Sequence, residues 1–356
     1  MKRKMKVLTR IKPLKPHLLE ILKKESNPVP LTRMILCAVG STLPLVIGAI
    51  NGHLPISIYG ALTGYFLALN DHLGTLGHRL WVVTLTFLFV LLGFCTGFLL
   101  HDQQVIFQIC IVGLVYWLGI LGGDGAELER ATLFLVVGLI AAFFSKTISL
   151  AMIPLFCLYS FIGYFSVMAA MLILKVFLKR EPEPFLGLRA SFQKSLTKER
   201  EKHIHAASYT LMTLSSIWFA QYFHVERGYW IAITVLLVMR ADPTLSLYKT
   251  SQRLFGTGLG VLFCEIVQII SDPWVLILGV MACTMTLPWA LKKNYLYASF
   301  LVTIFIVLLL ELAMATHGDT SNSFVRLRAT LIGCIFSVIG TAFSKLISRK
   351  GSSQAV

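Results

Sequence analysis

Long apolar segments recur along the whole of this 356-residue sequence, each of roughly 18–20 residues. A helix of about 20 residues crosses the hydrocarbon core of a bilayer, so every such segment is a candidate transmembrane helix. Only 14% of the residues are charged, where soluble domains carry roughly 25%. The pattern therefore predicts an all-α, polytopic membrane protein of about 12 transmembrane helices rather than a large soluble helical protein. We expect the spans at 34–50, 54–70, 80–100, 104–121, 131–146, 150–175, 206–223, 228–240, 253–270, 273–290, 294–314 and 328–347.

The expected spans form two sets of six, divided by one charged segment of mixed sign. A basic tail precedes them, and its Leu18–Leu22 stretch would let a short helix lie on the bilayer surface. A solvated tail that only fixes the topology explains the same residues equally well. The predicted organisation is a basic cytoplasmic tail at 1–33, a first six-helix membrane half at 34–175, a cytoplasmic linker at 176–205, a second six-helix membrane half at 206–347 and a cytoplasmic C-terminal tail at 348–356.

The distribution of basic residues predicts the orientation in the membrane. A net charge of +15 would suggest a nucleic-acid partner for a soluble protein, but here the excess lies in tails and loops. With a cytoplasmic N-terminus, 28 of the 32 Lys and Arg residues fall on the cytoplasmic side. We therefore expect a multi-pass protein of the bacterial inner membrane, with both ends cytoplasmic and no nucleic-acid partner. The four basic residues expected on the outer side are Lys146, Arg227, Arg326 and Arg328.

The stretch from Arg227 to Gly260 is typical of a helical hairpin in a membrane. Tyr229 and Trp230 would lie at one interface, where amphipathic rings are enriched. Pro243 disfavours helix at the residue before it and should end the first helix. Glycines 256, 258 and 260 would let the second helix approach a neighbour closely.

This hairpin also resembles the fusaric acid resistance protein-like (FUSC) family, which includes the aromatic acid exporters. The resemblance rests on a Gly-Tyr-Trp start, an Ala-x-Thr-Val-Leu-x-Val core at 232–238, a polar elbow and Gln-Arg-Leu-x-Gly-Thr-x-Leu-Gly at 252–260. The resemblance is specific over this hairpin and looser over the rest of the chain. The resemblance implies two membrane halves and export of small organic, aromatic acids. Family members usually carry soluble domains between or after the halves, for which this sequence leaves no room.

A weak internal repeat supports two parallel halves related by an axis along the membrane normal. Tyr59 precedes Asp71 by twelve residues, as Trp230 precedes Asp242. One other likeness conflicts with this arrangement, because Arg-Ala-Thr-Leu at 130–133 recurs at 328–331 in helices that would run in opposite directions. A miscounted span in the first half is the alternative. The further matched pairs are Ala61 with Ala232, Thr63 with Thr234, and Arg79 with Arg253.

Two carboxylates lie inside expected spans. An ionised side chain near the bilayer centre costs about 2.5–3.5 kcal/mol, so such residues usually face a cavity or a partner. Glu265 is the candidate for proton coupling, and Glu311, nearer the outer end of its span, is the second. A carboxylate that is paired with an arginine, or that reaches the interface, is the alternative for both.

The two elbows carry the other candidate residues. Asp71 and Asp242 occupy matching positions, followed by Arg79 and Arg253, whose planar guanidinium groups suit an organic carboxylate. A helix stop followed by a topology-setting arginine explains each elbow as well. The aromatic candidates, which would stack on a substrate ring or simply anchor the interface, are Tyr59, Tyr229 and Trp230.

No ATP-binding, metal or nucleophile–base motif occurs in the sequence, so we expect no enzyme activity, no cofactor and no metal. The leading hypothesis is a proton-coupled exporter of small organic acids in the inner membrane. The alternative is a non-transporting scaffold or subunit of an efflux or envelope assembly. The expected partners are the lipid bilayer, an organic acid, and either a second copy of the chain or a periplasmic adaptor.

Overall fold

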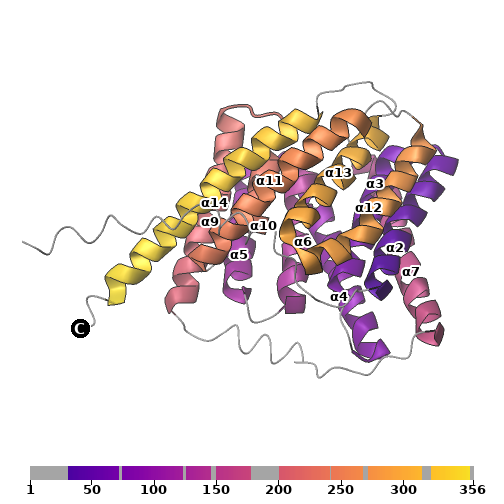
Figure 1. Ribbon diagram of the computed structural model, residues 1–356, viewed down its shortest axis with the longest axis horizontal. Helices are drawn as coiled ribbons and strands as arrows, with labels where there is room; N and C mark the ends of the chain where they lie inside the picture. Colours follow the sequence, from indigo (N-terminus) through magenta and orange to yellow (C-terminus); the bar gives the residue numbers. More distant parts are fainter. Residues whose placement is uncertain are drawn as a thin grey trace, which may run out of the picture.

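The computed structural model describes residues 31–71, 74–122, 126–145, 150–177, 200–240, 242–267, 272–314 and 322–352. All regular structure in these ranges is helical (Figure 1). The basic N-terminal tail, most of the linker and the last residues of the C-terminal tail lie outside the described residues. The helices are α2 (Leu31–Ile50), α3 (Leu54–Asn70), α4 (Leu76–Leu99), α5 (Gln104–Leu121), α6 (Ala126–Phe143), a short 3₁₀ helix (Leu150–Met152), α7 (Ile153–Phe177), α9 (Arg200–Tyr222), α10 (Tyr229–Val238), α11 (Pro243–Val267), α12 (Pro273–Lys293), α13 (Tyr295–Met314) and α14 (Asn322–Ser352).

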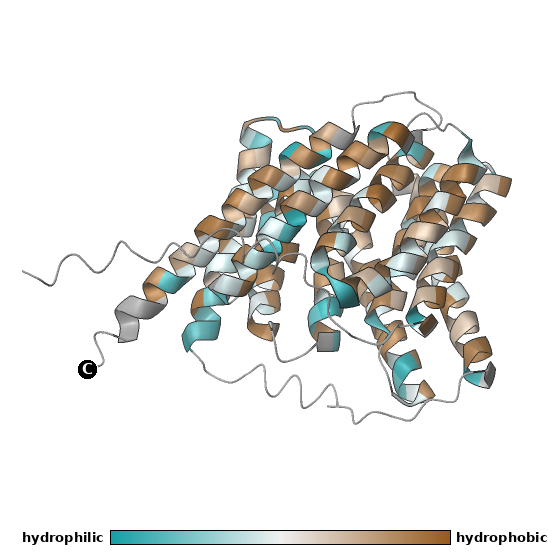
Figure 2. Cartoon of the chain, in the orientation of Figure 1, coloured by the Kyte–Doolittle hydropathy of each residue, from teal (hydrophilic) through white to brown (hydrophobic). Residues whose placement is uncertain are grey.

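Seven of the described helices are long and apolar enough to cross a membrane: α2, α4, α5, α7, α12, α13 and α14. Figure 2 shows apolar residues along the length of most helices. Two further apolar helices, α3 and α10, are shorter, at 17 and 10 residues. The predicted all-α, polytopic membrane class is therefore confirmed, and the count of twelve spans in two halves stays a prediction.

The same helix pairings occur in the two parts of the chain. In the first, α4 packs along α6, and α3 packs against α2 and α7; in the second, α11 packs along α13, and α10 packs against α9 and α14. Between the parts, α2 packs on α12 and α5 packs on α9, and these contacts lie toward opposite ends of the molecule (Figure 1). The predicted two-fold relation between halves requires this kind of reciprocal packing.

The two largest clusters of buried apolar side chains join the two parts, and two smaller clusters lie within one part each. One cluster joins α2, α3 and α7 to α12 and α13, and a second joins α5 and α6 to α9 and α10. A substitution in one of these shared clusters should therefore disturb the packing of both parts of the chain.

Glycines let several helices meet backbone to backbone. A Cβ atom at Gly64 would lie 2.0 Å from the carbonyl oxygen of Gly40. In the hairpin, Gly256 and Gly260 pack against α13, which confirms their predicted role, whereas a Cβ at Gly258 would meet no neighbouring group within 4 Å among the described residues. Close approach at small residues is a principal way in which membrane helices associate.

The Gly64→Ala variant is expected to unfold at a lower temperature in detergent. The added methyl group would force the α2 and α3 backbones apart, and overpacking of this kind costs about 1–3 kcal/mol. Gly258→Ala is the matched control, because its methyl group meets open space and alanine favours helix by about 0.5–1 kcal/mol. Thermal unfolding of the two purified variants should therefore shift in opposite directions, and equal melting temperatures would contradict this account of the packing.

Candidate functional site

Arg326 is the least expected charged group in the structure. It lies in the second turn of α14, its side chain is fully buried, and its residue is only 2% exposed. The guanidinium carbon lies 4.4 Å from the centre of the Trp230 ring. Within the described part of the chain, Nε, Nη1 and Nη2 of Arg326 have no hydrogen-bond partner. The last expected span begins at residue 328, after Arg326. The structure differs, because α14 begins at Asn322 and therefore includes Arg326.

A buried guanidinium without acceptors is energetically unfavourable. Arginine carries five N–H donors and stays charged in proteins. Removing an ion from water costs several kcal/mol even after the surroundings relax, and a cation–π contact returns only about 2 kcal/mol when desolvated. Such a group is usually compensated by an anion. Arg326 is therefore a candidate for binding a negatively charged group.

Arg253 adds a second positive charge to this region. It lies on α11, which packs on α14, and it is 3% exposed. Its Nε has no hydrogen-bond partner among the described residues. Arg253, which the sequence offered as an elbow arginine, and Arg326 are therefore both buried, on two helices that pack together.

Hydroxyl groups hold the backbone around Arg253 in place. Ser299 on α13 donates a hydrogen bond from Oγ to the carbonyl oxygen of Arg253 at 3.0 Å, and its Oγ lies 3.2 Å from Oγ1 of Thr257. One residue before Arg253, Gln252 donates from Nε2 to Oδ1 of Asn294 at 2.8 Å. These contacts fix the α11–α13 pair, so Arg253 is carried by a rigid element.

Aromatic side chains border the arginines on the α10 side. The rings of Tyr229 and Trp230 lie 5.0 Å apart, and Tyr229 stacks on Phe144 of the α6 end at 6.3 Å. Both α10 residues are partly buried. The third aromatic candidate, Tyr59 on α3, reaches the same end of α6, because its hydroxyl is 2.9 Å from Oγ of Ser145, the residue after Phe144. The structure therefore gathers the three rings in one region, with Trp230 in direct contact with Arg326.

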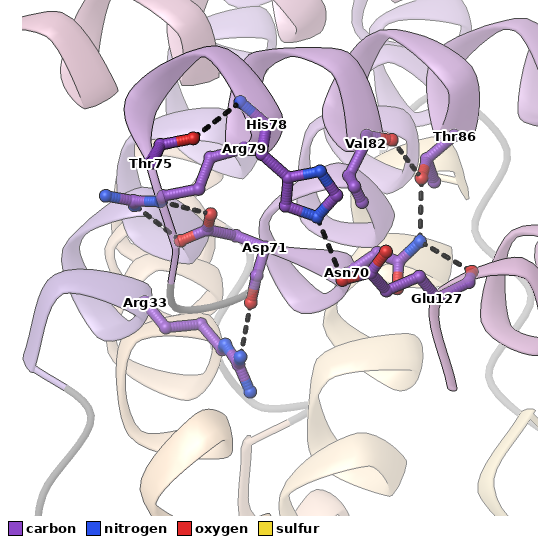
Figure 3. A network of polar contacts seen from close by, with 9 residues as sticks. All are labelled: Arg33, Asn70, Asp71, Thr75, His78, Arg79, Val82, Thr86 and Glu127. Atoms are coloured by element: carbon purple, nitrogen blue, oxygen red, sulfur yellow. Dashed lines mark hydrogen bonds and ion pairs between the residues drawn. The ribbon is translucent and has the colours of Figure 1, made fainter. Parts of the chain in front are cut away.

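The first elbow forms a closed ion pair (Figure 3). Asp71 is 3% exposed, and Arg79 donates to both of its carboxylate oxygens, from Nε at 2.8 Å and from Nη2 at 2.7 Å. Arg33 on α2 donates to the backbone carbonyl oxygen of Asp71. Since the carboxylate of Asp71 already satisfies Arg79, this pair ties α2, α3 and α4 together and presents no vacant arginine fork.

Further polar contacts extend this network to α6. Asn70 donates from Nδ2 to Oγ1 of Thr86 at 2.7 Å and to the carbonyl oxygen of Glu127 at 3.1 Å. The carboxylate of Glu127 lies 3.2 Å from Nε2 of His78 (Figure 3). Two residues further along α6, Glu129 reaches Arg240 in the second elbow at 3.6 Å. The start of α6 therefore contacts both elbows.

The second elbow differs from the first, although the sequence suggested that they match. Asp242 is exposed, and its Oδ1 accepts a hydrogen bond from the backbone N–H of Thr244 at 2.9 Å, so it caps α11. Arg253 lies eleven residues further along the helix, about 16 Å away at 1.5 Å per residue. The carboxylate of Asp242 is therefore not positioned to neutralise Arg253 as Asp71 neutralises Arg79.

The two candidate coupling carboxylates lie in different settings. Glu265 is exposed on α11, and Leu262, Phe263 and Ile266 beside it are exposed as well. Glu311 is partly buried near the end of α13. Glu265 therefore lies on the outer surface of the bundle, apart from the buried polar groups, and its part in proton coupling stays a prediction.

Comparisons with known proteins match part of the chain. Residues 214–340 match the family described as fusaric acid resistance protein-like. The chain is 36% identical over 124 residues to an uncharacterized protein of Synechocystis sp., which covers 34% of this chain and 16% of that protein. It is 25% identical over 141 residues to an uncharacterized protein of Haemophilus influenzae, which covers 39% of this chain and 19% of that protein. No solved structure matches the chain.

The matched segments thus span less than a fifth of either curated relative. The matched family segment runs from α9 into α14 and includes Trp230, Arg253 and Arg326. The similarity to the fusaric acid resistance protein-like family that the hairpin indicated is confirmed over residues 214–340, the segment that holds both buried arginines.

Proposed function

We propose that this chain is a transporter that exports small organic acids, aromatic ones above all, across the bacterial inner membrane. The seven apolar helices and the family similarity support a transporter-like membrane protein. The observation that carries the substrate class is Arg326, a buried guanidinium whose three nitrogens have no hydrogen-bond partner among the described residues. In this proposal the orientation follows the basic residues, with both ends of the chain cytoplasmic.

The chemistry of the site suits a carboxylate attached to a ring. A guanidinium donates two parallel N–H bonds to a carboxylate, and the bond to a charged partner contributes about 1.5–3 kcal/mol. Arg253 supplies a second positive charge, and Tyr229 and Trp230 supply apolar, polarisable surface for the ring. The site is positive and desolvated before the substrate arrives. A bound anion therefore compensates the unfavourable positive charge of the buried guanidinium.

Flux measured in proteoliposomes tests the proposal. The purified chain is reconstituted into vesicles loaded with labelled benzoate. We expect these vesicles to release benzoate faster than protein-free vesicles that carry the same load. The release should increase when a proton gradient is imposed and should be competed by other aromatic acids more than by a neutral amide such as benzamide. Benzoate release no faster than that from the protein-free vesicles would contradict the transporter proposal and favour the scaffold alternative.

Proton coupling has its own test. We expect Glu265→Gln to abolish the part of the benzoate release that depends on the proton gradient, because the amide cannot carry a proton. Glu226→Gln is the matched control, since Glu226 is an exposed carboxylate in the turn before α10. If the gradient accelerates release equally in the Glu265 variant and in the control, Glu265 is not the coupling group, and Glu311 becomes the candidate.

A further inference from the structure

Identical local contacts align the helices of the two halves. Thr63 on α3 donates to the carbonyl oxygen of Tyr59 at 2.8 Å, and Thr234 on α10 donates to the carbonyl oxygen of Trp230 at 2.8 Å. Many helical threonines make this bond, so the correspondence of Tyr59 with Trp230 follows from the sequence repeat, in which each precedes its elbow aspartate by twelve residues, and these bonds are consistent with it.

The helices that pack on α3 and α10 correspond in the same way. A Cβ atom at Gly163 of α7 would lie 2.4 Å from the carbonyl oxygen of Gly60, and one at Gly333 of α14 would lie 2.8 Å from the carbonyl oxygen of Ile231. Gly60 and Ile231 each follow their aligned aromatic residue by one position. Gly163 and Gly333 thus occupy the same place in their respective halves.

Counting back from these two glycines gives the residues that face the aligned rings. Phe156 precedes Gly163 by seven residues, and Arg326 precedes Gly333 by seven residues, about two helical turns in each case. The ring of Phe156 lies 5.8 Å from that of Tyr59, and the guanidinium of Arg326 lies 4.4 Å from that of Trp230. One position therefore holds phenylalanine on tyrosine in the first half and arginine on tryptophan in the second.

The first-half position is filled by apolar rings. Phe94 and Phe98 from α4 complete a cluster with Tyr59 and Phe156, with ring centres 5.3–6.4 Å apart. Phe156 itself has no exposed surface. The cluster therefore offers no positive charge and no vacant hydrogen-bond donor to an anion.

We infer that each chain holds a single organic-anion site, in the second half between α10, α11 and α14, and that Phe156 closes the corresponding position in the first half. This inference rests on the proposed function. It adds the number of sites in each chain and the position that decides whether a site forms: Arg326 creates a site in the second half, and Phe156 fills the same position in the first half as a plug. The bound group is a carboxylate that accepts hydrogen bonds from Arg326, with Arg253 as the second positive charge.

The test is a binding titration of labelled benzoate to the purified full-length chain in detergent. The wild-type protein is expected to bind one benzoate per chain. The Arg326→Phe variant installs the residue that the first half carries at this position, so the helices should pack, and its affinity should fall roughly 10- to 100-fold through loss of the charged donor. Phe156→Leu, a change of similar size in the plug, should keep one site with unchanged affinity.

Two results would overturn the inference while leaving the transporter proposal intact. One is a stoichiometry of two benzoates per wild-type chain, which needs no variant and stands even if Arg326→Phe fails to fold. The other is undiminished affinity in a monodisperse Arg326→Phe protein. By contrast, a wild-type protein that neither binds nor releases benzoate or any other aromatic acid would contradict the proposed function itself.

Discussion

Arg326→Met is expected to reduce benzoate efflux by about 10- to 100-fold and, in the same protein, to raise the melting temperature in the absence of substrate. The first effect follows from loss of a charge-assisted hydrogen bond worth about 1.5–3 kcal/mol. The second follows because the ligand-free protein no longer buries an unpaired ion, at a cost of several kcal/mol that exceeds the roughly 2 kcal/mol from the Trp230 contact. Methionine fills a similar volume without a charge.

The opposite signs of these effects separate a binding role from a structural one. A purely structural arginine would lower stability when removed, and transport would fall only as folded protein was lost. Arg328→Met is the matched control, because Arg328 lies two residues further along α14 and is exposed. It should change neither efflux nor melting temperature appreciably. Efflux and thermal unfolding measured on the same three proteins provide the check, and a lower melting temperature for Arg326→Met would contradict the assignment.

Asp71→Asn is expected to destabilise the protein by about 3–5 kcal/mol, the largest stability effect that we predict. The substitution leaves Arg79 in a setting where its side chain is 11% exposed and faces a neutral amide. It would also weaken the junction of α3 and α4, which the Asp71–Arg79 ion pair joins. The expected observation is a marked fall in folded yield and melting temperature.

Asp242→Asn is the control, since asparagine caps a helix as well as aspartate does and Asp242 is exposed. Its melting temperature should stay close to that of the wild type. The double variant Asp71→Asn with Arg79→Met should recover part of the stability, because it removes the uncompensated charge together with its former partner. Equal stability of Asp71→Asn and Asp242→Asn would contradict the difference between the two elbows.

The sequence predicted the helical class well because seven of the described helices carry their own signal in a long apolar run. The Asp71–Arg79 pair was also accessible, since both residues lie close together in the sequence around one elbow. The difference between the two elbows could not be predicted from the sequence. It arises because α11 extends back to Pro243, which turns Asp242 into a helix cap and places Arg253 deep in the helix, whereas α4 begins only at Leu76.

Arg326 escaped detection for a related reason. The residues around it, Asn322 to Arg328, are too polar to count as part of an apolar run, so hydropathy begins the last helix after them. Its burial depends on the Trp230 ring, almost a hundred residues earlier, and on the packing of α10 on α14. The spacing of Arg326 from Gly333, compared with Phe156 and Gly163, was the one signal that could have revealed it.

The most direct measurement of the central claim is an electron cryomicroscopy map of the chain with 4-iodobenzoate, whose heavy atom marks the ring. We expect density for one ligand in each chain, with the carboxylate about 2.8 Å from the guanidinium of Arg326 and the ring on the α10 side. A map that shows the ligand elsewhere, or beside Phe156 as well, while the same preparation transports benzoate, would contradict the account.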